Sequence, residues 1–251
     1  MSKPTILISN DDGAHAVGVR KLISIMRKLG DVVAILSEKP MSGMGHAVTM
    51  QQPLRTRLVA EEEGYIEYIT NGTPVDNIKL GKHLILKKTP DLVVSGINHG
   101  SNAAINIIYS GTMAAVLEAA IDGIPAIGFS LDDYSSLACF DHTDKFIEAI
   151  SLKVLKEGLP KGVCLNVNFP AFTEEGPHGI KVCRQAHARW IEAFEERQDP
   201  YGRNYYWMGG HFENGDGRHE TDLKALAENY VSIVPAQFDF TAHQYVTELN
   251  F

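Results

Sequence analysis

The sequence predicts an α/β fold in which a mostly parallel sheet is flanked by helices. Strand-like and helix-like segments alternate through the first two thirds of the chain, and several short apolar runs end abruptly in polar, glycine-containing loops. Such alternation is typical of βαβ units, whose parallel strands are joined by crossover helices. A chain of 251 residues can form one large domain. We expect a single domain over 1–251, with a core of about 1–185 and a C-terminal extension of about 186–251.

The first predicted βαβ unit covers residues 6–36. Residues 6–9 form a short apolar strand, residues 19–29 carry apolar side chains at helical spacing, and residues 32–36 form a second apolar strand. A second helix is expected to begin at Thr73-Pro74, because threonine is a good N-cap and proline suits the first helical position.

The alternation continues along the chain. We expect buried strands at 91–94, 126–129 and 163–167, and helices at 113–121 and 144–156. Each predicted helix falls between two predicted strands, as a parallel sheet requires.

Two segments differ in pattern. Residues 47–58 and 65–69 flank an acidic, glycine-containing turn and predict an extended antiparallel pair. The segment Arg189–Gly217 is rich in aromatic side chains and glycines, which predicts a projecting arm or hairpin that packs on another subunit. A loop folded on its own domain would explain the same composition.

The composition excludes some partners. The formal charge of −8 is the opposite of what binding to a nucleic-acid polymer requires. No stretch reaches the ~18 consecutive apolar residues of a membrane helix, and no signal-peptide-like apolar region precedes the first strand, so we expect a cytoplasmic protein without membrane contact. The three cysteines are widely spaced, which favours packing roles over a disulfide framework or a zinc site.

A carboxylate pair follows the first predicted strand. Asp11 and Asp12 come directly after the apolar run, and Gly13 allows the chain to turn so that both carboxylates can face one target. Ligands of open α/β sheets bind at the carboxyl ends of the strands. Two carboxylates without a neighbouring cysteine or histidine suit Mg²⁺ or Mn²⁺ better than zinc. A solvated turn is the alternative.

Three further loops are rich in small polar residues. Residues 95–102 follow another predicted strand, residues 40–46 follow the second strand, and Ser110-Gly111-Thr112 precede the helix at 113–121. A helix start with free amides, two hydroxyls and a glycine is a candidate anion site. Taken singly, a glycine-rich turn and ordinary helix capping explain the first and last of these loops equally well.

The chain also carries an ordered series of motifs. They are Asn10-Asp11-Asp12-Gly13, Ser42-Gly43, Gly72-Thr73-Pro74-Val75-Asp76, Ser95-Gly96-Ile97-Asn98 with Gly100 and Asn102, Tyr109-Ser110-Gly111-Thr112, Asp199-Pro200 with Gly202, Tyr206-Trp207, Thr221-Asp222, Tyr230-Val231-Ser232 and Asp239-Phe240-Thr241. In order and spacing they resemble the SurE family of survival-protein E nucleotidases, over essentially the whole chain.

The resemblance implies a metal-dependent phosphomonoesterase, a 5′-nucleotidase that releases phosphate from nucleoside monophosphates. The 5′-monophosphates are the expected substrates, with 3′-monophosphates as a further possibility. It also implies a Rossmann-like core, one divalent cation per subunit (Mg²⁺ or Mn²⁺), and a C-terminal hairpin or arm that helps to build a homodimer or homotetramer.

The resemblance also places functional residues on this chain. The implied metal ligands are Asp11, Asp12, Ser42 and Asn98, with Asp11 and Asp12 as catalytic residues. The implied phosphate-binding residues are Asn102, Ser110, Gly111 and Thr112. Two positions depart from the family pattern: Val17 replaces a usual proline, and Met41 replaces a common arginine, a change that bears on substrate preference.

Several features of the mechanism stay open at this point. We favour water as the attacking group over Asp11, because haloacid-dehalogenase-type phosphatases carry a second aspartate two residues on, where this chain has Gly13. His15 and His46 are candidates for the leaving-group acid, although a structural role is the more common one. The alternative functions are a nucleotide-binding regulatory module and a metal-dependent deacylase.

Overall fold

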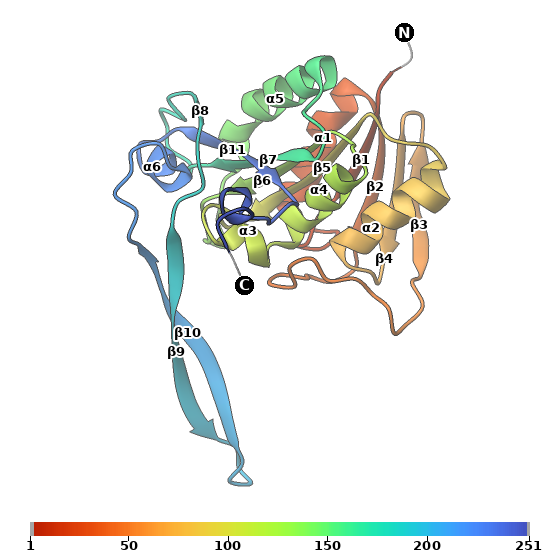
Figure 1. The fold of residues 1–251 in the computed structure, drawn as a ribbon. Coiled ribbons are helices and arrows are strands. Elements are labelled where there is room, and N and C mark those ends of the chain that lie inside the picture. Colours follow the sequence, from red (N-terminus) through yellow and green to blue (C-terminus); the bar gives the residue numbers. More distant parts are fainter. Residues whose placement is uncertain (1–2, 250–251) are drawn as a thin grey trace.

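The computed structural model describes residues 3–249, and its main feature is a nine-stranded sheet within that range. The strands lie in the order β3-β4-β2-β1-β5-β6-β7-β11-β8 (Figure 1). Their bounds are β1 Thr5–Ser9, β2 Asp31–Ser37, β3 Thr56–Glu62, β4 Tyr65–Thr70, β5 Leu92–His99, β6 Ala126–Leu131, β7 Val163–Phe169, β8 Ile180–Val182 and β11 Val231–Gln237. The strands from β4 to β7 are parallel, whereas β3 and β11 run antiparallel to β4 and β7.

Helices cover both faces of this sheet (Figure 1). The two helices α1 (Val17–Leu29) and α5 (Asp144–Glu157) pack on one face, and α2 (Pro74–Leu80) and α4 (Gly111–Ile121) pack on the other. Strand β1 supplies both cores, because alternate side chains of a strand point to opposite faces. Ile6 and Ile8 pack with α1, whereas Leu7 packs with α2 and α4. The predicted α/β fold with helices on both faces is confirmed.

The predicted start of α2 is confirmed in detail. Thr73 is the N-cap: its hydroxyl accepts a hydrogen bond from the amide of Asp76 at 3.2 Å, and the Asp76 carboxylate accepts one from the amide of Thr73 at 2.9 Å. This reciprocal capping satisfies two amides that have no partner inside the helix.

Some elements differ from the prediction. Residues 47–55 have no regular secondary structure, so the predicted strand at 47–58 begins only at Thr56. The short helices α3 (Asn106–Tyr109) and α6 (Asp222–Ala227) and the strands β8 and β11 were not expected. Strand β11 joins the main sheet late in the chain, beyond the alternating pattern on which the prediction relied.

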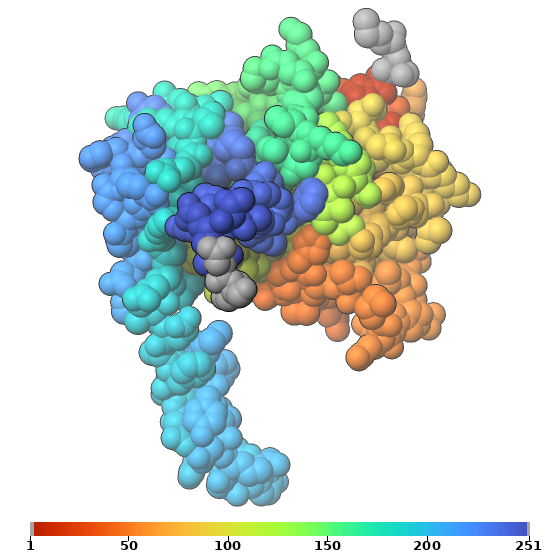
Figure 2. All heavy atoms as spheres, viewed as in Figure 1, coloured from red at the N-terminus to blue at the C-terminus, as the bar shows by residue number. Residues whose placement is uncertain are grey.

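An antiparallel hairpin of β9 (Ala188–Gln198) and β10 (Asn204–Asn214) projects from the globular body (Figures 1 and 2). It forms a separate two-stranded sheet, so the aromatic segment does not fold back on its own domain. Its outer part exposes Phe194, Tyr201, Tyr206, Trp207 and Met208. The predicted hairpin is therefore confirmed. Within residues 3–249, no helix has the length and apolar character needed to cross a membrane.

Candidate functional site

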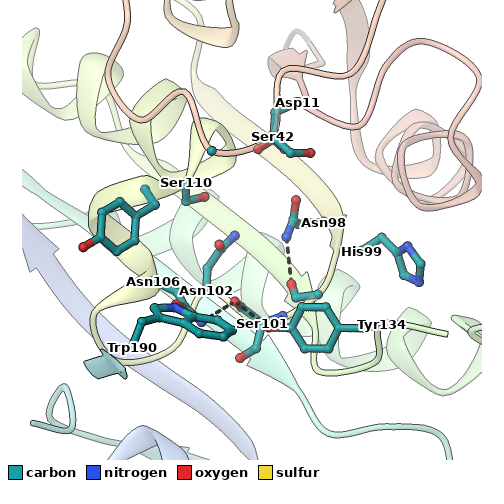
Figure 3. Close-up of a pocket in the computed structure, with 13 residues that line it drawn as sticks. Asp11, Ser42, Asn98, His99, Ser101, Asn102, Asn106, Ser110, Tyr134 and Trp190 are labelled. Carbon is teal, nitrogen blue, oxygen red and sulfur yellow. Dashed lines mark hydrogen bonds between the residues drawn. The ribbon is translucent and has the colours of Figure 1, made fainter. Parts of the chain in front are cut away.

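A pocket of about 250 Å³ lies at the carboxyl ends of β1 and β5, which are neighbours in the sheet (Figure 3). Its lining comes from the loops after β1, β2, β5 and β6, from the start of α4 and from the base of the hairpin. The lining residues are Asp11, Ser42, Gly43, Asn98, His99, Gly100, Ser101, Asn102, Asn106, Tyr109, Ser110, Tyr134 and Trp190. The sheet thus brings together loops that are distant in the sequence, as the strand-end rule requires.

Asp11 is the buried acid of the pocket, with an exposed fraction of only 3%. Its Oδ1 accepts a hydrogen bond of 2.5 Å from the Thr112 hydroxyl at the start of α4. A Cβ at Gly111 would lie 2.8 Å from Asp11 Cβ and 2.9 Å from its Oδ2. Only glycine at that position therefore lets the carboxylate lie against the first turn of α4, where amides favour a negative charge.

The neighbouring Asp12 is half-buried. Gly13 has a φ of +91°, which a glycine adopts freely and which turns the chain after the two acids. The Asp12 Oδ2 accepts a hydrogen bond of 2.9 Å from the amide of His99. Asp12 lines an adjacent pocket, whose other residues include Val17 and Phe140. Asp11 therefore lines the main pocket, and Asp12 lines the adjacent one.

Asn98 contributes an amide oxygen. The regular pairing of β5 with β6 shifts between Ser95 and Asn98. The Asn98 Nδ2 donates to the carbonyl of Gly100 at 2.7 Å, which fixes the amide plane. Its Oδ1 lies 3.5 Å from the Thr112 hydroxyl, on the side of the pocket that Asp11 occupies in Figure 3. Thr112 thus lies between the Asp11 carboxylate and the Asn98 amide oxygen.

Ser42 lies on an exposed loop that two backbone hydrogen bonds hold at the pocket. The amide of Met41 donates to the carbonyl of Asp11 at 2.7 Å, and the amide of Gly45 donates to the carbonyl of Tyr109 at 3.0 Å. Figure 3 shows Ser42 at the same end of the pocket as Asp11. The structure therefore gathers Asp11, Ser42 and Asn98 around one pocket, with Asp12 at its edge.

The carboxylates carry an uncompensated negative charge. Burial raises the pKa of Asp11 above its usual range, against the opposing effect of the Thr112 hydroxyl. Burial, together with repulsion by Asp11, raises the pKa of Asp12 to about 6. The residues that line the pocket, all in the described part of the chain, include no lysine or arginine. A bound cation would offset the charge of this pair.

The donor set fits a hard divalent cation. Two carboxylates, a hydroxyl and an amide oxygen are the ligands that Mg²⁺ and Mn²⁺ prefer. Over residues 3–249 there is no group of three or more His, Cys, Asp or Glu side chains that could hold a metal, which disfavours a zinc-type centre. The lack of a Cβ at Gly111 is what allows the Asp11 carboxylate to lie at this end of the pocket.

The predicted phosphate-binding residues lie at or next to the same pocket. Ser110 is the N-cap of α4, where its Oγ accepts from the amide of Met113 at 3.0 Å, and it lines the pocket. Asn102 also lines it, and its Nδ2 donates to Ser130 Oγ at 2.8 Å. Gly111 begins the helix. Thr112 is fully buried, with its hydroxyl directed to Asp11, and does not line the pocket.

Comparison with known proteins decides the family. The family profile described as "Survival protein SurE" matches residues 6–192. A curated relative from Cytophaga hutchinsonii, named "5′-nucleotidase SurE", is 55% identical over 100% of this chain and 97% of its own length. This chain belongs to the SurE family. The prediction from the ordered motifs is thereby confirmed.

Two further comparisons agree along the full length. A SurE relative from Christiangramia forsetii, also named "5′-nucleotidase SurE", is 54% identical over 99% of this chain and 96% of its own length. The crystal structure of the SurE protein from Aquifex aeolicus superposes with a TM-score of 0.84 at 38% identity, covering 98% of each chain. The family likeness therefore extends to the hairpin and the C-terminal strands.

Neither candidate acid lies in the pocket of this SurE chain. His15 is exposed and lines neither hollow beside the carboxylates. His46 Nε2 lies 3.0 Å from Glu118 Oε2, and Lys79 pairs with the other oxygen of the same carboxylate, so His46 anchors its loop to α4. His99 does line the pocket, but its Nε2 lies 2.6 Å from the carbonyl of Ser135 and its ring points away from Asn98 in Figure 3.

Part of the pocket lining was not predicted from the sequence. Asn106, Tyr134 and Trp190 lie at the end of the pocket away from Asp11 and Ser42 (Figure 3). Tyr134 lies in the loop after β6, and Trp190 lies at the base of the hairpin. The position of Tyr134 just beyond a strand end was a usable signal. No local pattern pointed to Trp190, because its place in the pocket depends on how the hairpin packs on the globular body.

Proposed function

We propose that this protein is a metal-dependent phosphomonoesterase that hydrolyses nucleoside 5′-monophosphates, and also 3′-monophosphates, to nucleoside and inorganic phosphate. Its family relatives are named 5′-nucleotidase, which confirms the predicted enzyme class. One observation supports the metal dependence above the others: the pocket combines the Asp11 carboxylate with a helix N-terminus and has Asp12 at its edge, yet none of its lining residues is lysine or arginine. A phosphate dianion can approach such a site only if a cation is bound there.

We assign Asp11, Asp12, Ser42 and Asn98 as the residues that hold one Mg²⁺ or Mn²⁺ per subunit. When bound, the cation neutralises the phosphoryl group and stabilises the leaving oxygen. The Thr112 hydroxyl positions Asp11 by its hydrogen bond of 2.5 Å, and the Asn98 amide is fixed by Gly100. Positioned ligands of this kind retain their geometry without reorganisation during the reaction.

We assign phosphate binding to the first residues of α4, together with Asn102. The Ser110 hydroxyl can donate to a phosphate oxygen while its lone pair accepts from Met113. The amides of Gly111 and Thr112 belong to the first turn of α4, where backbone N–H groups lack intrahelical partners. Asn102 Nδ2 retains a second hydrogen for the same purpose.

We favour water as the attacking group. The Asp11 carboxylate is buried, accepts from Thr112 and lies against Gly111, an arrangement that suits a fixed ligand more than a nucleophile. Ser110 is a poor nucleophile as well, because no base is paired with its hydroxyl: His46 is hydrogen-bonded to Glu118, and His99 to the carbonyl of Ser135. Trapping of a phosphorylated Asp11 would overturn this assignment.

Two alternative functions fit the site less well. A regulatory module that only binds a nucleotide would gain nothing from Asp11 and Asp12 facing an anion. A metal-dependent deacylase of the zinc type would need a histidine among the ligands. His15 and His46 lie outside the pocket, and His99, which lines it, is hydrogen-bonded to the carbonyl of Ser135.

The proposal is tested by measuring phosphate release from a panel of nucleoside 5′- and 3′-monophosphates, with Mg²⁺, with Mn²⁺ and with neither. We expect release from at least the 5′-monophosphates only when a divalent cation is present. If no member of the panel releases phosphate with either cation, the nucleotidase assignment is wrong.

We propose further that the hairpin contacts another subunit in a homodimer or homotetramer of a cytoplasmic enzyme. Deleting residues 194–208 and closing the strands with Asn-Gly between Ala193 and Gly209, which face each other in the ribbon, removes its exposed aromatic tip. We expect light scattering to show fewer subunits per particle in this variant than in the full chain, whose subunit mass is 27.6 kDa. An unchanged number of subunits would refute this role.

A further inference from the structure

Trp190 is one of the two tryptophans of the chain, and it lies where the hairpin leaves the body. Its indole is 40% exposed and forms part of the pocket wall. Figure 3 shows it at the end of the pocket away from Asp11 and Ser42. The hydrolysis proposed at Asp11 does not involve this large aromatic side chain, so another role is open to it.

The indole is held in place from two sides. Its Nε1–H donates to Asn106 Oδ1 at 2.8 Å, and its ring meets Phe212 of the paired strand edge to face, with the centroids 5.4 Å apart. Asn106 Nδ2 donates in turn to the carbonyl of Ser101 at 3.2 Å. A side chain with a polar anchor and an aromatic neighbour presents its face in a fixed orientation.

A buried carboxylate attaches the base of the hairpin to the pocket loop. Asp222 Oδ2 accepts from the amide of Ala104 at 2.8 Å, and its Oδ1 accepts from the amide of Ala186 at 3.0 Å. Ala104 follows the loop of Asn102, and Ala186 precedes Trp190 by four residues. The position of the indole is therefore fixed relative to the loop that carries Asn102, one of the residues assigned to phosphate binding.

A second aromatic ring stands across this end of the pocket. The Tyr134 hydroxyl accepts from the amide of Ser101 at 3.2 Å. Its ring lies over Gly100, where a Cβ would come within 2.6 Å of the ring carbon Cε1. Figure 3 shows Tyr134 and Trp190 on either side of Ser101. The far end of the pocket is thus bounded by two aromatic side chains.

We propose that Trp190 is a specificity-determining residue that stacks on the nucleobase of the substrate, with Tyr134 bounding the same subsite. The inference rests on the proposed function and goes beyond it, because it says why the enzyme prefers a nucleotide to a simpler phosphomonoester. Phosphate held at Ser110 leaves the rest of a nucleotide to extend toward Trp190. A π-face accepts any base, so the subsite selects for an aromatic base without strong discrimination among bases.

Kinetics with paired substrates tests this role. The readout is the ratio of kcat/KM for 5′-AMP to kcat/KM for ribose 5-phosphate, which has no base. Loss of one base–aromatic stack is worth about tenfold, so we expect Trp190→Leu to lower the ratio about tenfold, chiefly through KM for 5′-AMP. Trp190→Phe, which keeps an aromatic face, should recover most of it.

Phe172→Leu is the matched control, since Phe172 is an exposed aromatic side chain outside both the hairpin and the pocket lining. We expect it to leave the ratio unchanged. A ratio that is the same in Trp190→Leu and the wild type, with 5′-AMP still hydrolysed, would overturn the inference and leave the proposed function standing. Absence of phosphate release from both substrates in the wild type would instead overturn the proposed function.

Binding can be followed without catalysis. In Trp207→Phe, Trp190 is the only tryptophan, and a stacked adenine quenches indole fluorescence. We expect adenosine, which carries no phosphate and is not turned over, to quench it in a saturable manner, and ribose to have little effect. Equal responses to the two compounds would contradict the stacking role.

Discussion

Replacing Asp11 by asparagine is expected to reduce phosphate release by on the order of 10²- to 10³-fold, with the fold preserved. The substitution keeps the size of the side chain but removes one of two negative charges assigned to the cation. It also replaces a carboxylate oxygen by an NH₂ group at a position that lies against the first turn of α4. Rates should be compared at saturating Mg²⁺ and Mn²⁺, to separate weak cation binding from lost catalysis.

Loss of folding can be distinguished from loss of the site. A neutral amide is easier to bury than a carboxylate, so metal-free Asp11→Asn should unfold at a temperature no lower than the metal-free wild type. Added cation should raise the midpoint of the wild type only, since a ligand stabilises the state that binds it. Asp141→Asn, at an exposed acid that pairs with Lys21, is the control. Full activity in Asp11→Asn would show that the site is assigned to the wrong residue.

Replacing Thr112 by valine is expected to lower activity about 10- to 100-fold, the usual effect of losing a hydrogen bond that orients a metal ligand. Valine has nearly the same shape, but it lacks the hydroxyl that donates to Asp11 Oδ1 and lies between Asp11 and Asn98. Thr112 is fully buried, so no solvent can replace the lost donor. The readout is the apparent affinity for Mn²⁺, measured by the activity recovered on titration.

The conservative variant Thr112→Ser restores the hydroxyl and should recover most of that affinity. If valine and serine give the same loss, the hydroxyl is not the relevant feature, and packing at the start of α4 explains the effect. If neither variant changes the affinity for Mn²⁺, Thr112 does not position Asp11.

The core of the site could be predicted from sequence because it follows from one rule of sheet topology. Strands β1 and β5 are adjacent and parallel, so the residues just beyond their carboxyl ends must meet. Asp11 and Asn98 are at those ends, and Ser110 begins the helix that crosses above them. Short-range patterns suffice for this part of the site, since each residue lies within a few positions of an apolar run.

The remaining features depend on contacts that no local pattern encodes. The direction of the Thr112 hydroxyl is decided by the docking of α4 on the sheet, whereas its place at a helix start led to a prediction of phosphate binding. The place of Trp190 depends on Asp222, which lies 32 residues further along the chain and ties Ala186 to Ala104. The irregular path of residues 47–55 likewise depends on contacts with the start of α2, where the carbonyl of Ala47 accepts from the Thr73 hydroxyl at 2.8 Å and the amide of Thr49 donates to Asp76 at 3.1 Å.

The central claim is that the oxygen ligands of Asp11, Asp12, Ser42 and Asn98 form a cation-dependent phosphatase centre. Its most direct test is phosphate release from 5′-AMP by metal-stripped protein as Mn²⁺ is added back. We predict no release before addition and a saturable recovery that is complete at one Mn²⁺ per chain when the protein concentration exceeds the dissociation constant. Release that survives metal removal undiminished, or that never returns at any Mn²⁺ concentration, would contradict the claim.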